Sequence, residues 1–265
     1  MQNRYVGDVG DFAKYALLRR LVGRPDEQSI RLGVVWCLFP NETHNNDGRH
    51  ISYLDAPEFE GLDDLLLRML RRIVNSDRRA VSAVSSSLVF PKGTIFFDAP
   101  VIDPKSFPPS PTDRLRYRAD WLARCLTVAA QCDLVFFDPD NGLEVASVPK
   151  HHPNAGKYIY WDEVELFWRR GQALLIYHHL NRTVSADQQV SRLQDQFRSR
   201  LSGGSAFPLV FRRGSCRIFW LACGDTEVGQ ELKHRASKFL NSEWSRHFRP
   251  VGWPGEDQTA MRSAP

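Results

Sequence analysis

The stretch LVFFDPDNGLE, residues 134–144, decides the fold prediction for this chain. Its leading apolar residues predict a short strand buried on both faces, and the Asp-Pro step at Asp138 and Pro139 ends that strand. Asp140 and the Asn-Gly pair after it favour a rigid turn. In open α/β sheets, ligands bind at the carboxyl ends of the parallel strands. We therefore expect Asp138, Pro139 and Asp140 to be catalytic, although the two carboxylates could instead only cap the segment that follows.

Three other apolar runs have the same form, namely LGVVWCLF (32–39), TIFFDAP (94–100) and ALLIYHHLNR (173–182). Helical patterns lie between and after them, at residues 10–23, 62–74, 118–130 and 190–201. Strands that alternate with amphipathic helices predict a mostly parallel sheet covered on both faces. FPLVFRRGSCRIFWLACG (207–224) contains two apolar strands around a turn, which predicts an antiparallel hairpin. We predict an α/β fold with a Rossmann-like, mostly parallel sheet, flanking helices and a C-terminal antiparallel hairpin.

Length and composition bound the prediction. A chain of 265 residues with 42% hydrophobic content can bury one core, so we expect a single domain over residues 1–249 and a mobile tail over 250–265. No apolar run approaches the roughly 20 residues of a membrane helix, and residues 1–12 lack a signal-peptide core. We expect a cytoplasmic protein with no membrane partner. The five cysteines form no CxxC pair and are expected to be buried free thiols, and the net charge of +4 does not decide whether nucleic acid is a partner.

A second polar segment, THNNDGRH (43–50), follows the first predicted strand. His44, Asn46 and Asp47 could bind the ribose hydroxyls of a cofactor or a divalent metal, and a polar turn without a ligand is the other interpretation. The chain has no Gly-x-Gly-x-x-Gly fingerprint and no P-loop. We expect this bend and Asp138 to share one pocket.

Two further groups are candidates for the site. His178 and His179 are adjacent on a predicted strand and must face opposite sides of the sheet, so at most one of them can join a site. Lys14 lies one turn into the first predicted helix, where it could reach a cofactor. Asp11 is a plausible N-cap of that helix.

Several segments over about residues 10–224 resemble those of one known family, namely GDFAKYALL, ETHNN, FFDAP, LVFFDPD, YIYWDEVELFWRRGQALLIYHHLNR and the terminal hairpin. The chain thereby resembles the RlmJ-type adenine-N6 methyltransferases of large-subunit ribosomal RNA. The resemblance implies a methyltransferase-type fold, S-adenosylmethionine as cofactor, and RNA or DNA as partner. It implies that Asp138, with Pro139 beside it, holds the amino group to be methylated. It also implies that Asp98 binds the cofactor ribose and that Lys14 and His44 contact the cofactor.

The chain departs from that family at two places. The family has a glycine-rich turn after its Thr-His pair, where this chain has Asn-Asn-Asp at residues 45–47. Asp140 and Asn141 replace the second proline and the aromatic of the family's Asp-Pro-Pro-Tyr, so a flipped base would lose its usual stacking partner. The aromatic residues that could substitute are Tyr158, Tyr160 and Trp161.

Two alternatives remain open. Magnesium- or manganese-dependent nucleases and phosphodiesterases use oxygen and imidazole ligands, and the chain offers Asp98, Asp138, Asp140, Glu144, His44, Asp47 and His178. The other alternative is a catalytically silent methyltransferase-like module that binds RNA or a partner protein. The substrate, the modified atom and the oligomeric state do not follow from the sequence.

Overall fold

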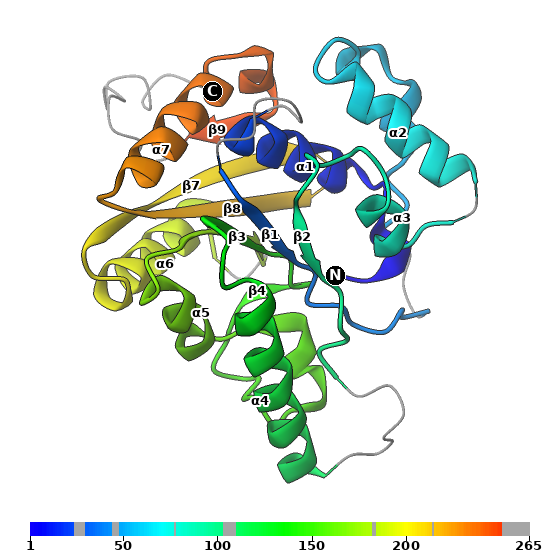
Figure 1. Ribbon diagram of the computed structural model, residues 1–265. Coiled ribbons are helices and arrows are strands. Elements are labelled where there is room, and N and C mark those ends of the chain that lie inside the picture. The colour runs from blue at the N-terminus through cyan, green and yellow to red at the C-terminus, as the bar shows by residue number, and fades with distance from the viewer. Residues whose placement is uncertain are drawn as a thin grey trace.

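The computed structural model describes residues 1–23, 30–43, 48–76, 78–102, 110–181, 184–213 and 215–250. Within these residues the main strands form a mixed seven-stranded sheet in the order β2-β1-β3-β6-β8-β7-β9 (Figure 1). Its parallel part consists of β2 (Ile95–Phe97), β1 (Leu32–Val35), β3 (Leu134–Phe137) and β6 (Ala173–His179). Its antiparallel part consists of β8 (Ser215–Gly224), β7 (Gly204–Arg213) and β9 (Phe248–Pro250). The predicted α/β class, parallel core and terminal hairpin are confirmed.

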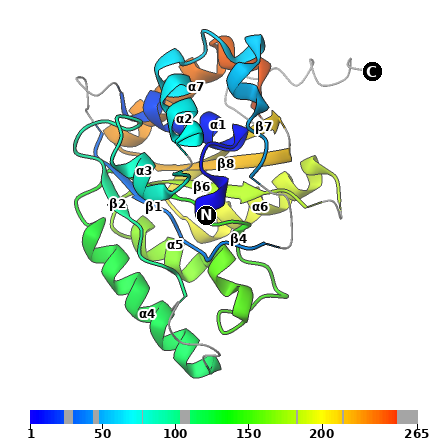
Figure 2. The same ribbon diagram turned by 90° about the vertical axis from the view of Figure 1, so that its right-hand side faces the viewer.

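Helices cover both faces of this sheet (Figures 1 and 2). One face carries α1 (Val9–Val22), α2 (Asp64–Asn75), α3 (Val81–Ser85) and α7 (Glu227–Leu240). The opposite face carries α4 (Pro111–Val128), α5 (Trp161–Trp168) and α6 (Ala186–Arg200). Side chains alternate along each strand, so Val34 packs into the first core and Val35 into the second.

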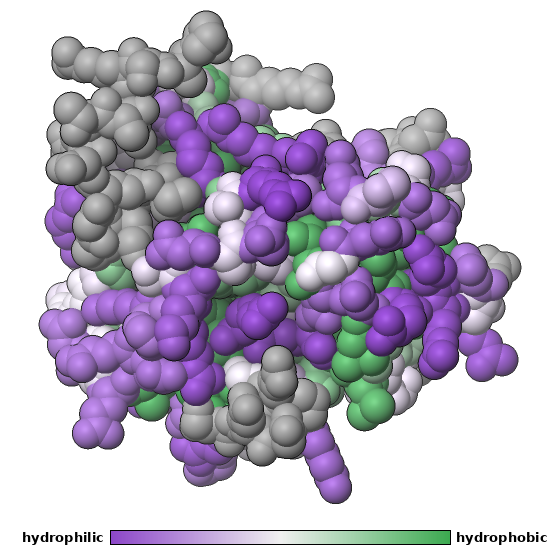
Figure 3. All heavy atoms as spheres, turned by 90° about the horizontal axis from the view of Figure 1, so that it is seen from above, coloured by the Kyte–Doolittle hydropathy of each residue, from purple (hydrophilic) through white to green (hydrophobic). Residues whose placement is uncertain are grey.

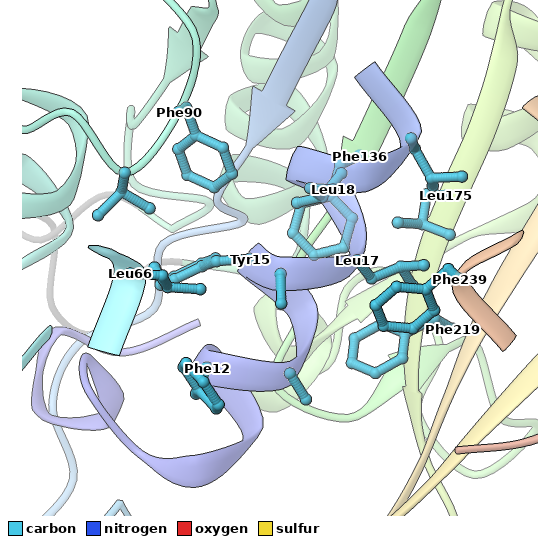
Figure 4. Packing of buried hydrophobic residues seen from close by; sticks show 14 of the residues in the cluster. Phe12, Tyr15, Leu17, Leu18, Leu66, Phe90, Phe136, Leu175, Phe219 and Phe239 are labelled. Atoms are coloured by element: carbon cyan, nitrogen blue, oxygen red, sulfur yellow. The ribbon is translucent and has the colours of Figure 1, made fainter. Parts of the chain in front are cut away.

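The helix α1 is buried almost all round, which is typical of a helix in the centre of a core rather than on its surface. Figure 4 shows its side chains Phe12, Tyr15, Leu17 and Leu18 among residues of other elements. These neighbours are Leu66 of α2, Phe90, Phe136 of β3, Leu175 of β6, Phe219 of β8 and Phe239 of α7. The packing holds the first turn of α1 close to the sheet, where the site is found.

The strand order creates a crevice at one edge of the sheet. From β1 the chain runs to β2 on one side, whereas β3 lies on the other side of β1 and leads on to β6. Connections that diverge in this way leave space outside the carboxyl ends of the two strands, which is where open α/β sheets bind ligands. The carboxyl ends of β1 and β3 are Val35 and Phe137, so Asp138 stands at this switch point.

Shorter elements complete the described chain. β4 (Gly142–Leu143) and β5 (Tyr158–Ile159) form a small parallel sheet, and 3-10 helices span Asn3–Tyr5, Ser52–Asp55, Pro57–Phe59, Pro153–Lys157 and Glu243–Arg246. None of the helices in the described ranges is both long and apolar enough to cross a bilayer. The predicted tail lies outside the described residues from 251 onward, as do residues 103–109 of the proline-rich segment 100–114.

Some element boundaries differ from the prediction. β1 ends at Val35, because Cys37 has a φ of +44°, a left-handed conformation that interrupts the extended backbone. α4 begins at Pro111 rather than Arg118, since Ser110 caps it by accepting a hydrogen bond from the Asp113 amide. α5 has no counterpart among the predicted helical patterns. The cysteines are free thiols, as predicted, and all except Cys216 are buried, namely Cys37, Cys125, Cys132 and Cys223.

Candidate functional site

A cavity of about 310 Å³ lies at the switch point, between the first turn of α1 and the carboxyl ends of β3 and β6. Asp8, Asp11 and Lys14 line it from the α1 side, and Asp138 and Asp140 line it from the turn after β3. Buried charges at a concave surface are typical of functional sites.

The polar bend after β1 reaches the same cavity. Gly48 and His50 are the residues of this bend that line it in the described part of the chain, together with Asp138. The expectation that the bend and the acidic strand end share one pocket is therefore confirmed. The candidate residues His44, Asn46 and Asp47 lie outside the described residues.

Asp138 is held rigidly at the end of β3. Its amide donates to the Val35 carbonyl at 3.0 Å, which continues the pairing of β3 with β1 for one more residue. Its carboxylate is 3% exposed, and Oδ2 lies 2.6 Å from Lys14 Nζ. Oδ1 accepts no hydrogen bond from any residue that the structure describes. This oxygen is the one that a ligand in the cavity can reach.

Lys14 bridges two buried carboxylates. Besides Asp138, its Nζ contacts Asp11 Oδ1 at 2.7 Å, and Asp11 Oδ2 accepts hydrogen bonds from the Tyr15 hydroxyl and the Gly7 amide. Burial opposes the charge on Lys14, but Asp11 and Asp138 outweigh it and raise the pKa of Lys14 above its ordinary value. The lysine therefore stays charged and holds one oxygen of Asp138 in place.

The prediction that Asp11 is the N-cap of α1 is wrong. Asp8 caps the helix, because its Oδ1 accepts a hydrogen bond from the Gly10 amide at 2.9 Å. The helix can begin this early because Gly7 turns the chain with a φ of +86°. Asp11 lies inside the helix, where it faces Lys14 instead.

Three oxygen atoms around the switch point converge on one nitrogen. The amino group of Met1 donates to the carbonyls of Cys37 and Asp138, at 3.2 and 2.8 Å, and lies 2.6 Å from Asp140 Oδ1. The left-handed backbone at Cys37 is uncommon for a residue with a side chain and is typical of functional sites. We call these oxygens of Cys37, Asp138 and Asp140 the ammonium cradle, because their geometry suits a group with three N–H donors.

Arg217 forms part of the cavity wall without having been predicted. It lies on β8 opposite His179 in the antiparallel register. Its Nη2 donates to Asp8 Oδ1 at 2.9 Å, and a Cβ at Gly10 would lie 2.7 Å from its Cζ. The only signal in the sequence was an arginine within an otherwise apolar strand, since a buried arginine needs a partner. Tyr177 of β6, which lines the cavity beside it, was also missed.

The two adjacent histidines separate as expected. His179 lines the cavity, whereas His178 is buried and its Nδ1 accepts a hydrogen bond from the Leu143 amide at 3.1 Å. Burial lowers the pKa of His178 to about 4, so the ring is neutral at pH 7. Because the His179 amide also donates to the Asn141 carbonyl, β6 anchors the turn that carries Asp140.

Several other candidates do not reach the cavity. Both enzyme hypotheses predict one cavity that Asp98 and Asp138 reach together, and this prediction is wrong. Asp98 is exposed at the end of β2 and does not line the cavity, so a cofactor would have to extend past β1 to meet this carboxylate. Of the three possible stacking aromatics, Tyr160 donates to the Val148 carbonyl and Trp161 donates to Gln196, and neither they nor Tyr158 line the cavity.

The acidic residues do not form a metal centre within the described ranges. No group of three or more His, Cys, Asp or Glu side chains there is placed to hold a metal ion. Asp138 is paired with Lys14 instead, and Glu144 does not line the cavity.

Comparison with known proteins assigns the chain to no family, because no family model matches it and no curated protein has a matching sequence. The function therefore has to be inferred from the geometry of the cavity.

Proposed function

We propose that this protein is an S-adenosylmethionine-dependent methyltransferase that acts on an amino group of a nucleic-acid base. One observation carries the proposal: Asp138 presents a single carboxylate oxygen to a cavity at the switch point, while Lys14 holds the other oxygen. That arrangement suits an acceptor which must orient an amine without reacting with it.

The sheet supports the proposal. The parallel strands β2, β1, β3 and β6 are followed by a hairpin in which β8 is antiparallel to β6 and to β7. A parallel core with a terminal antiparallel hairpin is what the resemblance to adenine-N6 methyltransferases implies. Fold alone does not define an activity, so the site must carry the rest of the argument.

The charges along the cavity support this choice of cofactor, and Lys14 is the predicted cofactor residue that lines the cavity within the described ranges. S-adenosylmethionine has an ammonium group, a carboxylate and a positive sulfonium, and when bound it would supply the methyl group. The ammonium cradle, which the amino group of Met1 occupies in this structure, has oxygens that would hold the first if Met1 moved away, and Arg217 is a candidate for the second. Carboxylates also outnumber Lys and Arg side chains along the cavity, which favours a ligand with a sulfonium.

The chain's own residues then do three things. Asp138 Oδ1 accepts a hydrogen bond from the substrate amino group and so points the nitrogen lone pair into the cavity. Lys14 prevents the carboxylate from rotating, because it binds Oδ2 at 2.6 Å. Bound substrate and cofactor would displace the water that the cavity admits, which would strengthen the contacts of these buried groups and keep the amine in line for transfer. The proton that the amine gives up afterwards passes to Asp138 Oδ1 or to solvent.

The test uses Asp138→Ala, with Asp133→Ala as a matched control at the opposite end of the same strand. Transfer of labelled methyl to RNA and to DNA is measured, and thermal shifts are recorded with S-adenosylmethionine, its demethylated product, Mg²⁺ and Mn²⁺. Asp138→Ala should lose at least about 100-fold in turnover while the cofactor still stabilises it. The control should behave as the wild type.

Two results would overturn the proposal. One is wild-type turnover in Asp138→Ala, because then the carboxylate does not orient the amine. The other is stabilisation of the wild type by Mg²⁺ or Mn²⁺ but not by S-adenosylmethionine, which would favour a metal-dependent nuclease. Absence of any shift together with absence of methyl transfer would favour a silent binding module.

A further inference from the structure

The helix α2 has two faces of opposite character. Leu66, Leu67, Leu70 and Ile73 are buried in the core shared with α1. The outer face carries three basic residues, which we call the arginine face: Arg68, Arg71 and Arg72. They border an open hollow of about 420 Å³ that continues to the end of the helix.

The arginine face is electrostatically unbalanced. Beyond its first residue, α2 has no acidic side chain. Arg68 and Arg72 are one turn apart, at positions where like charges repel each other on a helix. Arg71 is paired with Asp55 at 3.3 Å, but Arg68 and Arg72 are exposed and form no ion pair within the part of the chain that the structure describes. An external anion would remove this repulsion.

Two close approaches connect α2 with the wall of the cavity. Arg71 donates to the Leu54 carbonyl, in the 3-10 helix that follows the cavity residue His50. A Cβ at Gly7, the neighbour of Asp8, would lie only 2.4 Å from Val74 Cγ2 of α2. The last turn of α2 therefore packs directly behind the cavity rim.

The chain after α2 strengthens this connection. Arg79 donates through Nε to the Val6 carbonyl at 2.6 Å and through Nη2 to the carbonyl of Gly48, which lines the cavity. The molecule seen from the side of α1, α2 and α7 is mainly hydrophilic (Figure 3). Arg79 thus links the chain after α2 to the cavity rim.

We infer that the arginine face binds the phosphate backbone of the nucleic-acid strand whose base enters the cavity. The inference rests on the proposed function and adds the surface that positions the substrate. Guanidinium groups match phosphate oxygens in charge and geometry, and contacts to phosphate fix the register of a strand without reading its sequence. If a base leaves its strand and enters the cavity next to Asp138, the neighbouring phosphates would remain at the rim, on the side of α2.

The experiment measures binding separately from methyl transfer. Fluorescence anisotropy gives the Kd of the full chain for a labelled single-stranded RNA and for a DNA of the same sequence, from 50 to 300 mM salt. The variant is Arg68→Gln with Arg72→Gln. The matched control is Arg192→Gln with Arg198→Gln, two exposed arginines on α6 at the opposite face of the sheet. Thermal unfolding of both variants checks that they fold as the wild type does.

For the α2 variant we expect Kd to rise about tenfold and the slope of log Kd against log salt to fall by about 1.4, the loss of two phosphate contacts to a single strand. The control should keep the wild-type Kd and slope. Equal weakening in both variants, an unchanged Kd in the α2 variant, or no binding of either oligonucleotide by the wild type would each overturn the inference.

This experiment distinguishes the surface from the activity. If methyl transfer is observed and the α2 variant binds and reacts normally, the proposed function is supported and the phosphate-binding role of the arginine face is refuted. If no methyl transfer occurs but binding depends on Arg68 and Arg72, the phosphate-binding role of the arginine face is supported and the proposed function is refuted. The comparison of RNA with DNA then shows which strand is preferred.

Discussion

Two buried ion pairs on opposite faces of the sheet show what distinguishes a structural pair from a functional one. Arg118 of α4 binds Glu163 of α5 in a bidentate pair, with Nε to Oε1 at 2.8 Å and Nη2 to Oε2 at 2.7 Å. Two further donors of Arg118 bind the carbonyls of Ala155 and Tyr158, and the Tyr160 amide donates to Glu163. Both oxygens of this carboxylate are in use.

The pair of Lys14 and Asp138 is as deeply buried but incomplete. One oxygen of Asp138 binds Lys14, and the other faces a cavity of about 310 Å³. Burial of charge costs desolvation in both pairs, and hydrogen bonds offset that cost only where every oxygen is used. An incomplete buried pair therefore indicates a place for a ligand, whereas a complete one indicates structure.

The largest effect should come from breaking the complete pair. Arg118→Met leaves the fully buried carboxylate of Glu163 without its main partner, and we expect a loss of about 3–5 kcal/mol in the free energy of unfolding. Urea denaturation at pH 7 measures it. Replacing both partners, with Arg118→Met and Glu163→Leu, should recover most of the loss. A loss below about 1 kcal/mol in the single variant would contradict a structural role.

The second prediction concerns the anchor of the site, His178. Its folded pKa of about 4 lies below the ordinary 6.5, so the unfolded chain binds the extra proton between these values. The contribution of the neutral ring to the free energy of unfolding is therefore fully present above pH 6.5. It is lost as the pH falls toward 4, by about 3 kcal/mol in total. Urea denaturation across this range should show that part of the pH dependence disappear in His178→Gln. An unchanged pH dependence would show that the ring is not held neutral.

The third prediction concerns the incomplete pair. Lys14→Met should cost about 1–3 kcal/mol, less than Arg118→Met, because the cavity lets water reach the carboxylates that it leaves behind. Burial already raises the pKa of Asp11 and Lys14 opposes that rise, so without Lys14 the pKa of Asp11 rises further. The acid limb of the pH profile for methyl transfer should therefore move to higher pH. Wild-type stability together with an unchanged pH profile in this variant would show that Lys14 has no role in the site.

The smallest effect should follow from Gly10→Ala. The added Cβ would displace the Arg217 guanidinium, which it would meet at 2.7 Å, while alanine favours the helix by up to about 1 kcal/mol. Stability should therefore change little. The affinity for S-adenosylmethionine, measured by calorimetry, should fall a few-fold because the Arg217 guanidinium shifts within the cavity while it keeps its contact with Asp8. If affinity is unchanged, Arg217 does not contact the cofactor.

Much of this fold could be predicted because its signals are local. The apolar run before Asp138 became β3, and all four of its residues are buried. His178 and His179 faced opposite ways because strand side chains alternate. Helix starts were predicted less well, since Asp8 rather than Asp11 caps α1, and the capping residue depends on a turn at Gly7 that periodicity does not reveal.

The sequence by itself determined the main strands, most of the long helices and the fact that a carboxylate follows a buried strand, because these features depend on residues a few positions apart. Only the tertiary structure decided which groups meet. Lys14 and Asp138 are 124 positions apart, and Asp8 and Arg217 are 209 apart. Their contacts depend on strand order and register, which the packing of the whole sheet selects. The same packing left Asp98, a carboxylate at an equally plain strand end, outside the cavity.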